Sequence, residues 1–290
     1  MSLMSKLSAI LISISLFAGM AHAAADGAST SEDQKVVDYL KSMIGHNPAV
    51  SSIDVSIVNK IPLEEPAGWQ AYVIMLDGKV KSKEGEQSVR QQQIYFVNGD
   101  IITPELHNIR LKRRVNELVS PAFDEAFYLE RNRLSGNADA AHKVVIFSDP
   151  LCPFCRQFVP SAIAEMKAAP ETYAVYYFHL PLATLHPAAV TLVKAAIAAE
   201  AQGRKNVVLD LYNVEINPRE TNPQVILDAF NQAMGTKITL QQIEEPSVLR
   251  HYEEDQQIAM RMMVNGTPTL FFDGKKDPSK KKYKEFKGNK

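Results

Sequence analysis

Two cysteines separated only by Pro153 and Phe154 constrain this chain more than any other feature. Cys152 and Cys155 are the only cysteines among the 290 residues. A disulfide between them would close a very small loop and remove little entropy from the unfolded chain, so stapling of the fold is a poor explanation. Redox exchange and metal binding remain as interpretations of the pair.

The segments on either side of the pair predict a strand-to-helix junction. Lys143–Ser148 is an almost continuous apolar run, typical of a buried strand, and a helical pattern extends from Pro153 to Lys167. Pro153 suits the first turn of a helix because proline has no N–H to leave unpaired. Cys152 is therefore expected at the helix N-terminus, where unpaired N–H groups and the helix dipole stabilise a thiolate.

This position suits thiol–disulfide exchange. A free cysteine with a pKa of ~8.5 is mostly protonated at neutral pH, and only the thiolate attacks a disulfide. We expect Cys152 to be the exposed, attacking nucleophile and Cys155, one turn later, to be the more buried, resolving thiol. Pro153 and Phe154 would modulate the pair. No cofactor beyond the redox-active Cys152–Cys155 disulfide is expected.

Metal binding is the competing interpretation of the two cysteines. A lone C-x-x-C can be half of a zinc site, but that site needs two further Cys or His ligands at suitable spacing. The histidines after the first 25 residues show no such pairing, so we expect no metal site: His46, His107, His142, His179, His186 and His251.

A second motif, Gly266-Thr267-Pro268-Thr269, stands directly before the strand-like run Leu270–Phe272. Proline is awkward on entering a buried strand unless a turn uses it, often through a cis bond. If Pro268 is cis and faces Cys152, the backbone of Thr267 is free to pair with an extended substrate segment. An ordinary trans turn proline is the equal alternative.

The first 23 residues indicate export. Lys6 precedes an apolar run, Leu7–Met20, and Ala21-His22-Ala23 has small residues where a signal peptidase needs them. This order predicts a signal peptide, residues 1–23, cleaved after Ala23; an uncleaved anchor is the alternative. The 32 basic and 33 acidic residues leave a net charge of −1, which gives no global reason to expect nucleic-acid or membrane binding.

Residues 24–108 predict a small α+β domain. A helical pattern, Glu32–Ile44, is followed by three strand-like segments, Ile53–Ile61, Trp69–Val80 and Val89–Ile102. Two dipeptides with hairpin-turn chemistry, Asp77-Gly78 and Asn98-Gly99, interrupt or flank these strands. We expect a scaffold or a partner surface, because no cluster of polar side chains in this region suits catalysis.

The rest of the chain predicts a connecting segment and a second domain. Ile109–Leu134 is expected to be a linker helix kinked at Pro121, and Ser135–His142 a polar loop. The catalytic domain, 143–290, continues with a strand at Tyr173–Leu180, a helical insertion at about 187–264 and a strand at Thr269–Asp273. Two alternatives remain for the C-terminal part of this domain: Lys282–Phe286 forms an edge strand, or Asp277-Pro278 caps a short helix.

The run from Phe147 to Phe158, with Thr267-Pro268 far downstream, resembles the thioredoxin superfamily. The whole arrangement is similar to bacterial thiol:disulfide interchange proteins of the DsbC and DsbG type. That resemblance implies an α/β thioredoxin fold with an inserted helical subdomain. It also implies a cystatin-like domain at 24–108 that makes a V-shaped homodimer, with a linker helix and loop at 109–142.

Single positions refine the resemblance. Relatives of the thioredoxin and DsbA kinds have a buried acid where this chain has Ile146, whereas Asp149 and Thr267 match the DsbC and DsbG kind. The segment Leu180–Ala189 resembles DsbA-like oxidases. Within it, His186 is either a catalytic assistant or, as we favour, a residue that caps or packs at a helix start.

The resemblance implies a dimeric disulfide isomerase or reductase in the periplasm of a Gram-negative bacterium. Its partners would be unfolded or misoxidised exported proteins and a DsbD-like or DsbB-like membrane redox protein, with no nucleic acid. The alternatives are a dimeric DsbA-like oxidase, a redox-independent chaperone and a copper or zinc carrier. The direction of exchange depends on differences of a few tens of millivolts, where ~30 mV corresponds to ~1.4 kcal/mol.

Overall fold

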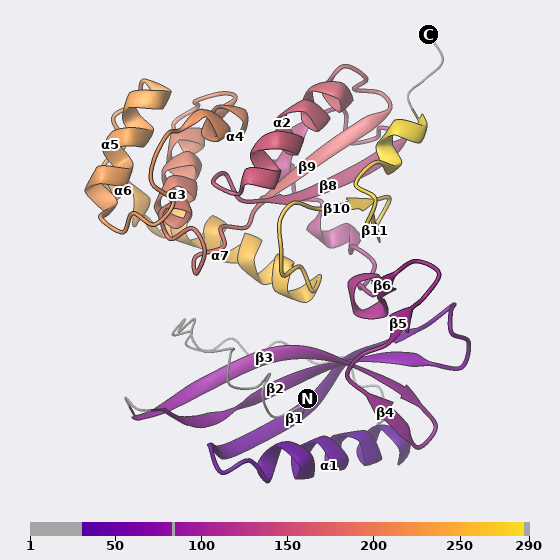
Figure 1. Cartoon of the computed structure of the whole chain (residues 1–290). Helices are drawn as coiled ribbons and strands as arrows, with labels where there is room; N and C mark the ends of the chain where they lie inside the picture. Colours follow the sequence, from indigo (N-terminus) through magenta and orange to yellow (C-terminus); the bar gives the residue numbers. More distant parts are fainter. Residues whose placement is uncertain (1–30, 83–84, 287–290) are drawn as a thin grey trace. The chain divides into compact units, whose positions relative to one another are not determined.

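The computed structural model describes residues 31–82 and 85–286 and divides the chain into two units between Asn116 and Glu117 (Figure 1). The division lies inside the segment predicted as a linker, 109–142. The predicted signal peptide, residues 1–23, lies outside the described residues. Among the residues that are described, no helix is long and apolar enough to cross a membrane.

The first unit is a helix packed on an antiparallel meander, as predicted. Helix α1 (Ser31–Gly45) covers one face of a four-stranded sheet, and its Val36 and Leu40 enter a shared core with Tyr72 and Ile74. The sheet order is β1 (Val50–Pro62), β2 (Gln70–Ser82), β3 (Gly85–Asn98) and β4 (Ile101–Thr103); β5 (His107–Asn108) and β6 (Arg113–Arg114) form a separate ladder.

One of the two predicted hairpin turns is wrong. Gly78 lies within β2, opposite Ile53 of β1, and the strand continues to Ser82. A Cβ at Gly78 would lie 2.3 Å from the carbonyl oxygen of Ser52, so glycine serves here to let two strands approach closely. The other prediction is confirmed, because Gly99, at φ +55°, turns β3 into β4.

The predicted linker helix over Ile109–Leu134 is also wrong. This segment contains β6, the 3₁₀ turns η3 (Val115–Glu117), η4 (Glu125–Phe127) and η5 (Glu130–Asn132), and the start of β7 (Arg133–Ser135). The physical reason is tertiary. Phe123 donates its backbone N–H to the carbonyl of Gly274 at 2.7 Å, and its ring packs at 5.7 Å from Phe178. These long-range contacts outweigh a helix that Pro121 would break.

The second unit contains a five-stranded sheet in the order β11-β10-β8-β9-β7. The central strands β8 (His142–Ser148) and β9 (Tyr173–His179) are parallel, and β10 (Thr269–Phe272) pairs antiparallel with β8. Strand β7, which lies partly in the predicted polar loop, pairs with β9, and β11 (Lys275–Lys276) forms the other edge. Helix α2 (Pro153–Lys167) begins and ends where the sequence predicted.

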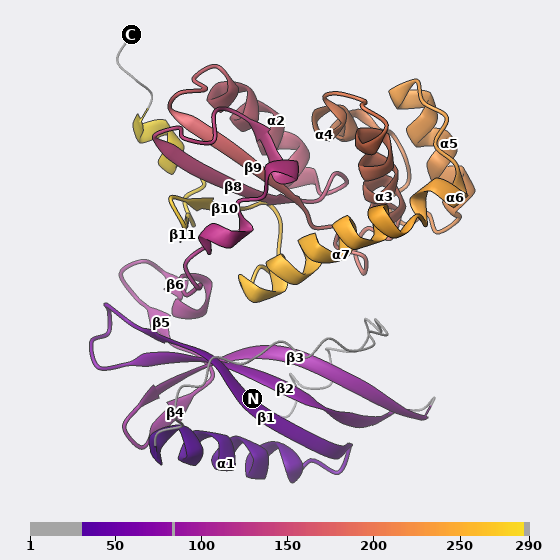
Figure 2. The same ribbon diagram turned by 180° about the vertical axis from the view of Figure 1, so that it is seen from behind.

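Helices cover both faces of this sheet. Ile146, Val159 and Ile163 share one core cluster on the α2 side, whereas Phe147, Phe271 and Ile258 share another on the opposite side. The inserted helices α3 to α6 gather beyond one end of the sheet, and α7 returns toward it (Figure 2). The insertion comprises α3 (Ala188–Ala201), α4 (Val207–Asp210), η6 (Leu211–Asn213), α5 (Pro223–Met234), α6 (Leu240–Ile243) and α7 (Pro246–Arg261).

The end of the described chain resolves the alternative left open by the sequence. Lys282–Phe286 is the 3₁₀ helix η7 and not a strand. The Asp277 carboxylate accepts the N–H of Ser279 at 3.0 Å and that of Lys282 at 2.9 Å, so it organises the turn before this helix. Tyr283 is buried in the α2-side core.

Candidate active site

Cys152 stands at the junction between β8 and α2. It is the N-cap residue of the helix, with φ −69° and ψ 122°, and Pro153 occupies the first turn. Its side chain makes no capping hydrogen bond, and the first N–H groups of a helix have no partner within the helix itself. The predicted position of Cys152 at the start of the helix is confirmed.

The second motif lies next to the first, although 115 residues separate them. The Thr267–Pro268 peptide is cis, and the Cys152 thiol donates to the Thr267 carbonyl at 3.6 Å. Of the two alternatives left open for Pro268, the cis form holds. Thr269 then leads into β10, and its hydroxyl donates to the Gly266 carbonyl at 2.7 Å.

Cys152 is less exposed than the sequence led us to expect. Only 5% of the residue is accessible, against 0% for Cys155, while Phe154 between them is 70% exposed. Its contact with Thr267 covers the sulfur from the side of the proline loop. The order of accessibility still distinguishes the two thiols, both of which are free.

Cys155 lies in the apolar core between α2 and the sheet. Burial raises the pKa of its thiol to about 11, and the nearby polar groups of Ser148, the Asp149 backbone and Thr267 oppose that rise. The proximity of Cys152 raises it further. At neutral pH Cys155 is therefore a thiol that must lose a proton before it can attack.

Asp149 organises the loop before Cys152. Its fully buried carboxylate accepts the backbone N–H of Leu151 at 2.7 Å and of Leu182 at 2.8 Å, and it contacts His186 Nδ1 at 2.9 Å. The carboxylate thus joins the loop that carries the cysteines to the segment that leads into α3. His186 packs against Asp149 near that helix start, which is the role we favoured for it over direct catalysis.

Arg156 is a structural residue that sequence reasoning missed. Its guanidinium donates to the carbonyl of Pro150 at 2.9 Å and to that of Val214 at 2.5 Å. It therefore ties the cysteine loop to the inserted helices. Its place directly after Cys155 was the one available signal, and arginine at that place is equally compatible with a solvated helix face.

A chain of buried hydroxyls runs away from Cys155. Ser148, the last residue of β8, lies 2.6 Å from Tyr212 through the two hydroxyl oxygens, and the Tyr212 hydroxyl lies 2.9 Å from that of Tyr177 in β9. All three residues are buried. Tyr212 comes from the insertion, so no local pattern in the sequence indicated that it reaches the sheet.

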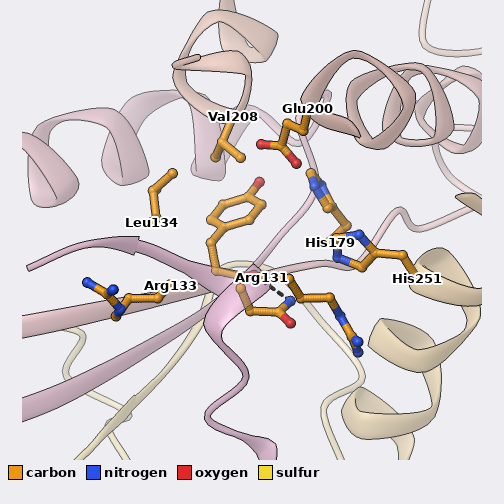
Figure 3. Close-up of a pocket in the computed structure, with 9 residues that line it drawn as sticks. Arg131, Arg133, Leu134, His179, Glu200, Val208 and His251 are labelled. Carbon is orange, nitrogen blue, oxygen red and sulfur yellow. Dashed lines mark hydrogen bonds between the residues drawn. The ribbon is translucent and has the colours of Figure 1, made fainter. Parts of the chain in front are cut away.

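Tyr177 lines a pocket of about 110 Å³ that also holds titratable side chains. Figure 3 shows Glu200, His179 and His251 next to one another in this pocket. Burial raises the pKa of Glu200 to about 7 and lowers the pKa values of His179 and His251 to about 3 and about 4. These groups are therefore neutral over much of the range around pH 6.

Asp255 lies beside this pocket and shares its character. The fully buried carboxylate accepts the N–H of His179 at 2.8 Å and the side-chain N–H of Asn132 at 2.9 Å. Burial nevertheless raises the pKa of Asp255 to about 7. Sequence reasoning did not find this cluster, because its members come from α3, α7, β9 and η5.

The structure gives no candidate metal centre in the residues that it describes. Within 31–82 and 85–286, no three His, Cys, Asp or Glu side chains are grouped so that they could hold a metal ion.

Residues 129–289, more than half of the chain, match the family model described as Thioredoxin. The chain belongs to the thioredoxin family. Its match begins within the segment predicted as a linker, in agreement with β7 being part of the sheet. Family membership supports thiol–disulfide oxidoreduction as the general class of chemistry for the dithiol.

Curated relatives match over about half of this chain. The Na(+)/H(+) antiporter NhaA 1 of Mycolicibacterium gilvum is 30% identical over 155 residues, which cover 51% of this chain and 24% of the relative. NhaA 3 of Salinispora tropica is 28% identical over 155 residues, covering 51% and 22%. The chain thus matches only about a quarter of the length of these relatives.

Solved structures are similar to this chain over about half its length. A thioredoxin-like oxidoreductase from Silicibacter pomeroyi shares 24% identity at a TM-score of 0.42, covering 49% of this chain and 80% of its own. Oxidised BdbD from Bacillus subtilis shares 19% at 0.43, covering 59% and 95%. A periplasmic thioredoxin-like protein from Salmonella enterica serovar Typhimurium shares 20% at 0.42, covering 53% and 84%.

Proposed function

We propose that this protein is a thiol–disulfide oxidoreductase in which Cys152 attacks and Cys155 resolves. One observation carries the proposal: Cys152 is the N-cap of α2 with its sulfur 3.6 Å from the Thr267 carbonyl, and Cys155 lies buried one turn behind it. Cys152 would attack a substrate disulfide to give a mixed disulfide. Cys155 would then displace the substrate thiolate and close the Cys152–Cys155 disulfide.

Thr267 and Pro268 are the proposed substrate-binding residues. They lie beside Cys152, so an extended substrate segment that pairs with the Thr267 backbone would bring its disulfide to the attacking sulfur. Asp149 would act by holding the cysteine loop in place through its hydrogen bonds with Leu151 and Leu182. Pro153 starts the helix, and the exposed Phe154 offers an apolar contact to the substrate.

Two substitutions test the assignment of roles. Cys152→Ser should abolish exchange with a disulfide-bonded protein such as insulin, because the remaining thiol is buried. Cys155→Ser should accumulate mixed disulfides through Cys152, visible on non-reducing gels and by mass spectrometry. Undiminished exchange by Cys152→Ser would overturn the proposal, and a Cys155→Ser protein that releases substrate as fast as wild type would remove the resolving role.

For the direction of exchange, we propose isomerisation or reduction of misoxidised exported proteins, with a DsbD-like membrane partner returning electrons. The support is the resemblance of Asp149 and Thr267 to the DsbC and DsbG kind. Acid quenching of intact cells followed by thiol alkylation and a gel shift reports the redox state of the two cysteines. Mostly reduced cysteines are expected; mostly oxidised ones would favour the DsbA-like oxidase with a DsbB-like partner.

Export and dimerisation complete the proposal. Lys6, the apolar run Leu7–Met20 and Ala21-His22-Ala23 support export to the periplasm, and N-terminal sequencing of the protein from a periplasmic extract should begin at Ala24. The compact first unit, with its own helix and sheet, supports a homodimer through that unit. Sedimentation should give twice the chain mass at micromolar concentration, whereas a monomer there would contradict the dimer.

A further inference from the structure

The resolving thiol presents a problem of proton transfer. Cys155 is fully buried, and Ile146, behind it in the same core cluster, has no group that could accept a proton. The nearby carboxylate of Asp149 already accepts two backbone N–H groups and contacts His186. The proton that leaves Cys155 therefore needs another route out of the core.

The hydroxyl chain defined by Ser148, Tyr212 and Tyr177 offers such a route. At one end the Ser148 side chain is close enough to the Cys155 thiol to oppose the rise of its pKa, and the hydroxyl oxygens that follow are 2.6 Å and 2.9 Å apart. Each hydroxyl can accept one proton while it donates its own, so a connected chain can move a proton without moving heavy atoms. The three residues are buried and are surrounded mainly by apolar side chains, which keeps the path separate from solvent.

The far end of the chain opens into the pocket of about 110 Å³ that Tyr177 and Glu200 both line. The pocket has room for water molecules to complete the path between them. Glu200 also lines a larger groove of about 720 Å³, so a proton that reaches its carboxyl can pass on to solvent. Burial places the pKa of Glu200 at about 7, which suits a group that accepts and releases protons near neutral pH.

The other charged and titratable groups around Glu200 come from several elements. In the pocket they are Arg131, Arg133, Tyr177, His179 and His251, and the Asp255 carboxyl beside the pocket, whose pKa is also about 7, interacts with Glu200. Arg131 pairs with Glu254 and Arg133 with Glu130, and the two histidines are held neutral by burial. In the groove they are Lys167, Arg204, Lys205, Arg250 and Glu254.

We propose that Ser148, Tyr212 and Tyr177 relay the proton of Cys155 to Glu200 when Cys155 attacks the mixed disulfide. The proposal rests on the function proposed above. Cys155 gives its proton to the Ser148 hydroxyl, each hydroxyl of the chain passes a proton to the next, and the Glu200 carboxylate receives the last proton. The bond between Cys152 and the substrate sulfur breaks, the Cys152–Cys155 bond forms, and the substrate leaves as a thiolate with the electron pair. Ser148 is the catalytic residue of this relay, and Tyr212 and Tyr177 are positioning residues.

A stopped-flow reaction of the reduced full-length protein with Ellman's disulfide separates the two steps. Attack by Cys152 releases a first thionitrobenzoate anion, and attack by Cys155 releases a second. Tyr212→Phe removes the hydroxyl that joins both hydrogen bonds and should slow the second release at least about tenfold, since general acid–base assistance contributes roughly 10²–10⁴-fold. Ser148→Ala should have a similar effect. The first release should change by less than about twofold in both variants.

Tyr173→Phe is the matched control. Tyr173 lies in the same strand as Tyr177, and its buried hydroxyl donates to the Tyr283 carbonyl at 2.6 Å, away from the relay. This variant loses a core hydroxyl and its hydrogen bond, so it reports the structural cost alone. Its second release should stay within about twofold of wild type.

The pH profile of the second release tests the acceptor. In wild type the rate should rise as Glu200 loses its proton, through about pH 7. Glu200→Gln should remove that inflection and slow the step above pH 7, and a structural defect would lower the rate at every pH without moving the inflection. A slow Tyr212→Phe protein with an unchanged Glu200→Gln profile would overturn Glu200 as the acceptor.

The remaining outcomes are also decisive. An unchanged second release in both Tyr212→Phe and Glu200→Gln overturns the relay. Should Tyr212→Phe fail to fold, Tyr177→Phe takes its place with the same expectation. A wild-type protein that shows no second release would instead contradict the proposed function, because Cys155 would then not resolve the mixed disulfide.

Discussion

The two units of the chain treat buried charge in different ways. In the first unit the buried carboxylate of Asp33 lies 3.0 Å from Lys60 Nζ and accepts the Tyr72 hydroxyl at 3.1 Å. In the second unit Asp255 is fully buried and Glu200 is partly buried, and burial raises the pKa values of both to about 7, so they are mostly neutral below that pH. The carboxylate of the first unit thus has a positively charged partner, whereas the carboxyl groups of the second unit gain and lose protons near neutral pH.

This difference distinguishes the first unit, which we expect to be a scaffold, from the second unit, which carries the candidate active site. Groups with strongly shifted pKa values gather at functional sites, because burial there is not offset by a partner charge. Cys155 belongs to that set, and it is connected to the pocket of Glu200 by hydroxyl groups. Three of the following tests concern the second unit, at a titratable group or in the segment that carries the cysteines, and one concerns a packed side chain of the first unit. Their expected effects decrease from the first test to the last.

The largest effect concerns the reactivity of Cys155. With a pKa of about 11 its thiolate fraction at pH 7 is about 10⁻⁴, against about 10⁻¹·⁵ for an unfolded cysteine with a pKa of ~8.5. In a Cys152→Ser protein, iodoacetamide should therefore alkylate Cys155 at least about two orders of magnitude more slowly when folded than in denaturant. Equal alkylation rates in the folded and the denatured protein, measured by mass spectrometry, would contradict the raised pKa of Cys155.

A core substitution in the first unit should change stability without changing chemistry. Leu40 is fully buried between α1 and the sheet, so Leu40→Ala should lower the free energy of unfolding by about 2–5 kcal/mol. Urea titration measures the loss. Exchange by the folded fraction should stay at the wild-type rate; a matching loss of exchange rate would show that the first unit takes part in the chemistry.

Asp255→Asn should change how stability depends on pH. The folded-state pKa of Asp255, about 7, is above its unfolded value, so its stabilising contribution is complete below about pH 4 and is lost as pH rises through 7. Glu200 acts in the same sense, and the lowered pKa values of His179 and His251 act in the opposite sense below pH 6.5. Relative to wild type, the Asn variant should gain up to about 1.4 kcal/mol per pH unit between pH 4 and 7. If the free energy of unfolding changed with pH in the same way in both proteins, the raised pKa of Asp255 would be contradicted.

The smallest stability effect is expected at Phe154. Its side chain is 70% exposed, so Phe154→Ala should change the free energy of unfolding by less than about 0.5 kcal/mol. Exchange with protein disulfides should fall several-fold because the apolar contact is lost, while exchange with glutathione should not change. A similar fall for both substrates would show that Phe154 acts on the cysteines and not on the bound protein.

Local signals explain how far the sequence could predict this molecule. Helix α2 was predicted at both ends, because Pro153 and the apolar spacing of its own residues determine it. The linker helix was wrong because Phe123 packs among rings and donates to Gly274, contacts that no window around Phe123 contains. Gly78 was taken for a turn because its role, closeness to Ser52 on another strand, is also non-local.

In the candidate site, too, residues in local motifs were predicted and residues brought together by the fold were not. Cys152, Cys155 and the motif containing Pro268 were found because each sits in a short, recognisable pattern. The hydroxyl chain was missed, since Tyr212 comes from the insertion and Tyr177 resembles any residue of a buried strand.

The central claim is that the second unit holds a dithiol that cycles with its own disulfide. Equilibrating the protein in glutathione buffers of graded potential, then acid-quenching and alkylating it, measures this by mass spectrometry. We predict one two-electron transition between a dithiol and an internal Cys152–Cys155 disulfide, with a tenfold change in ratio for each ~30 mV. A protein that collects glutathione on its cysteines, or stays reduced, without ever forming that internal disulfide would contradict the account.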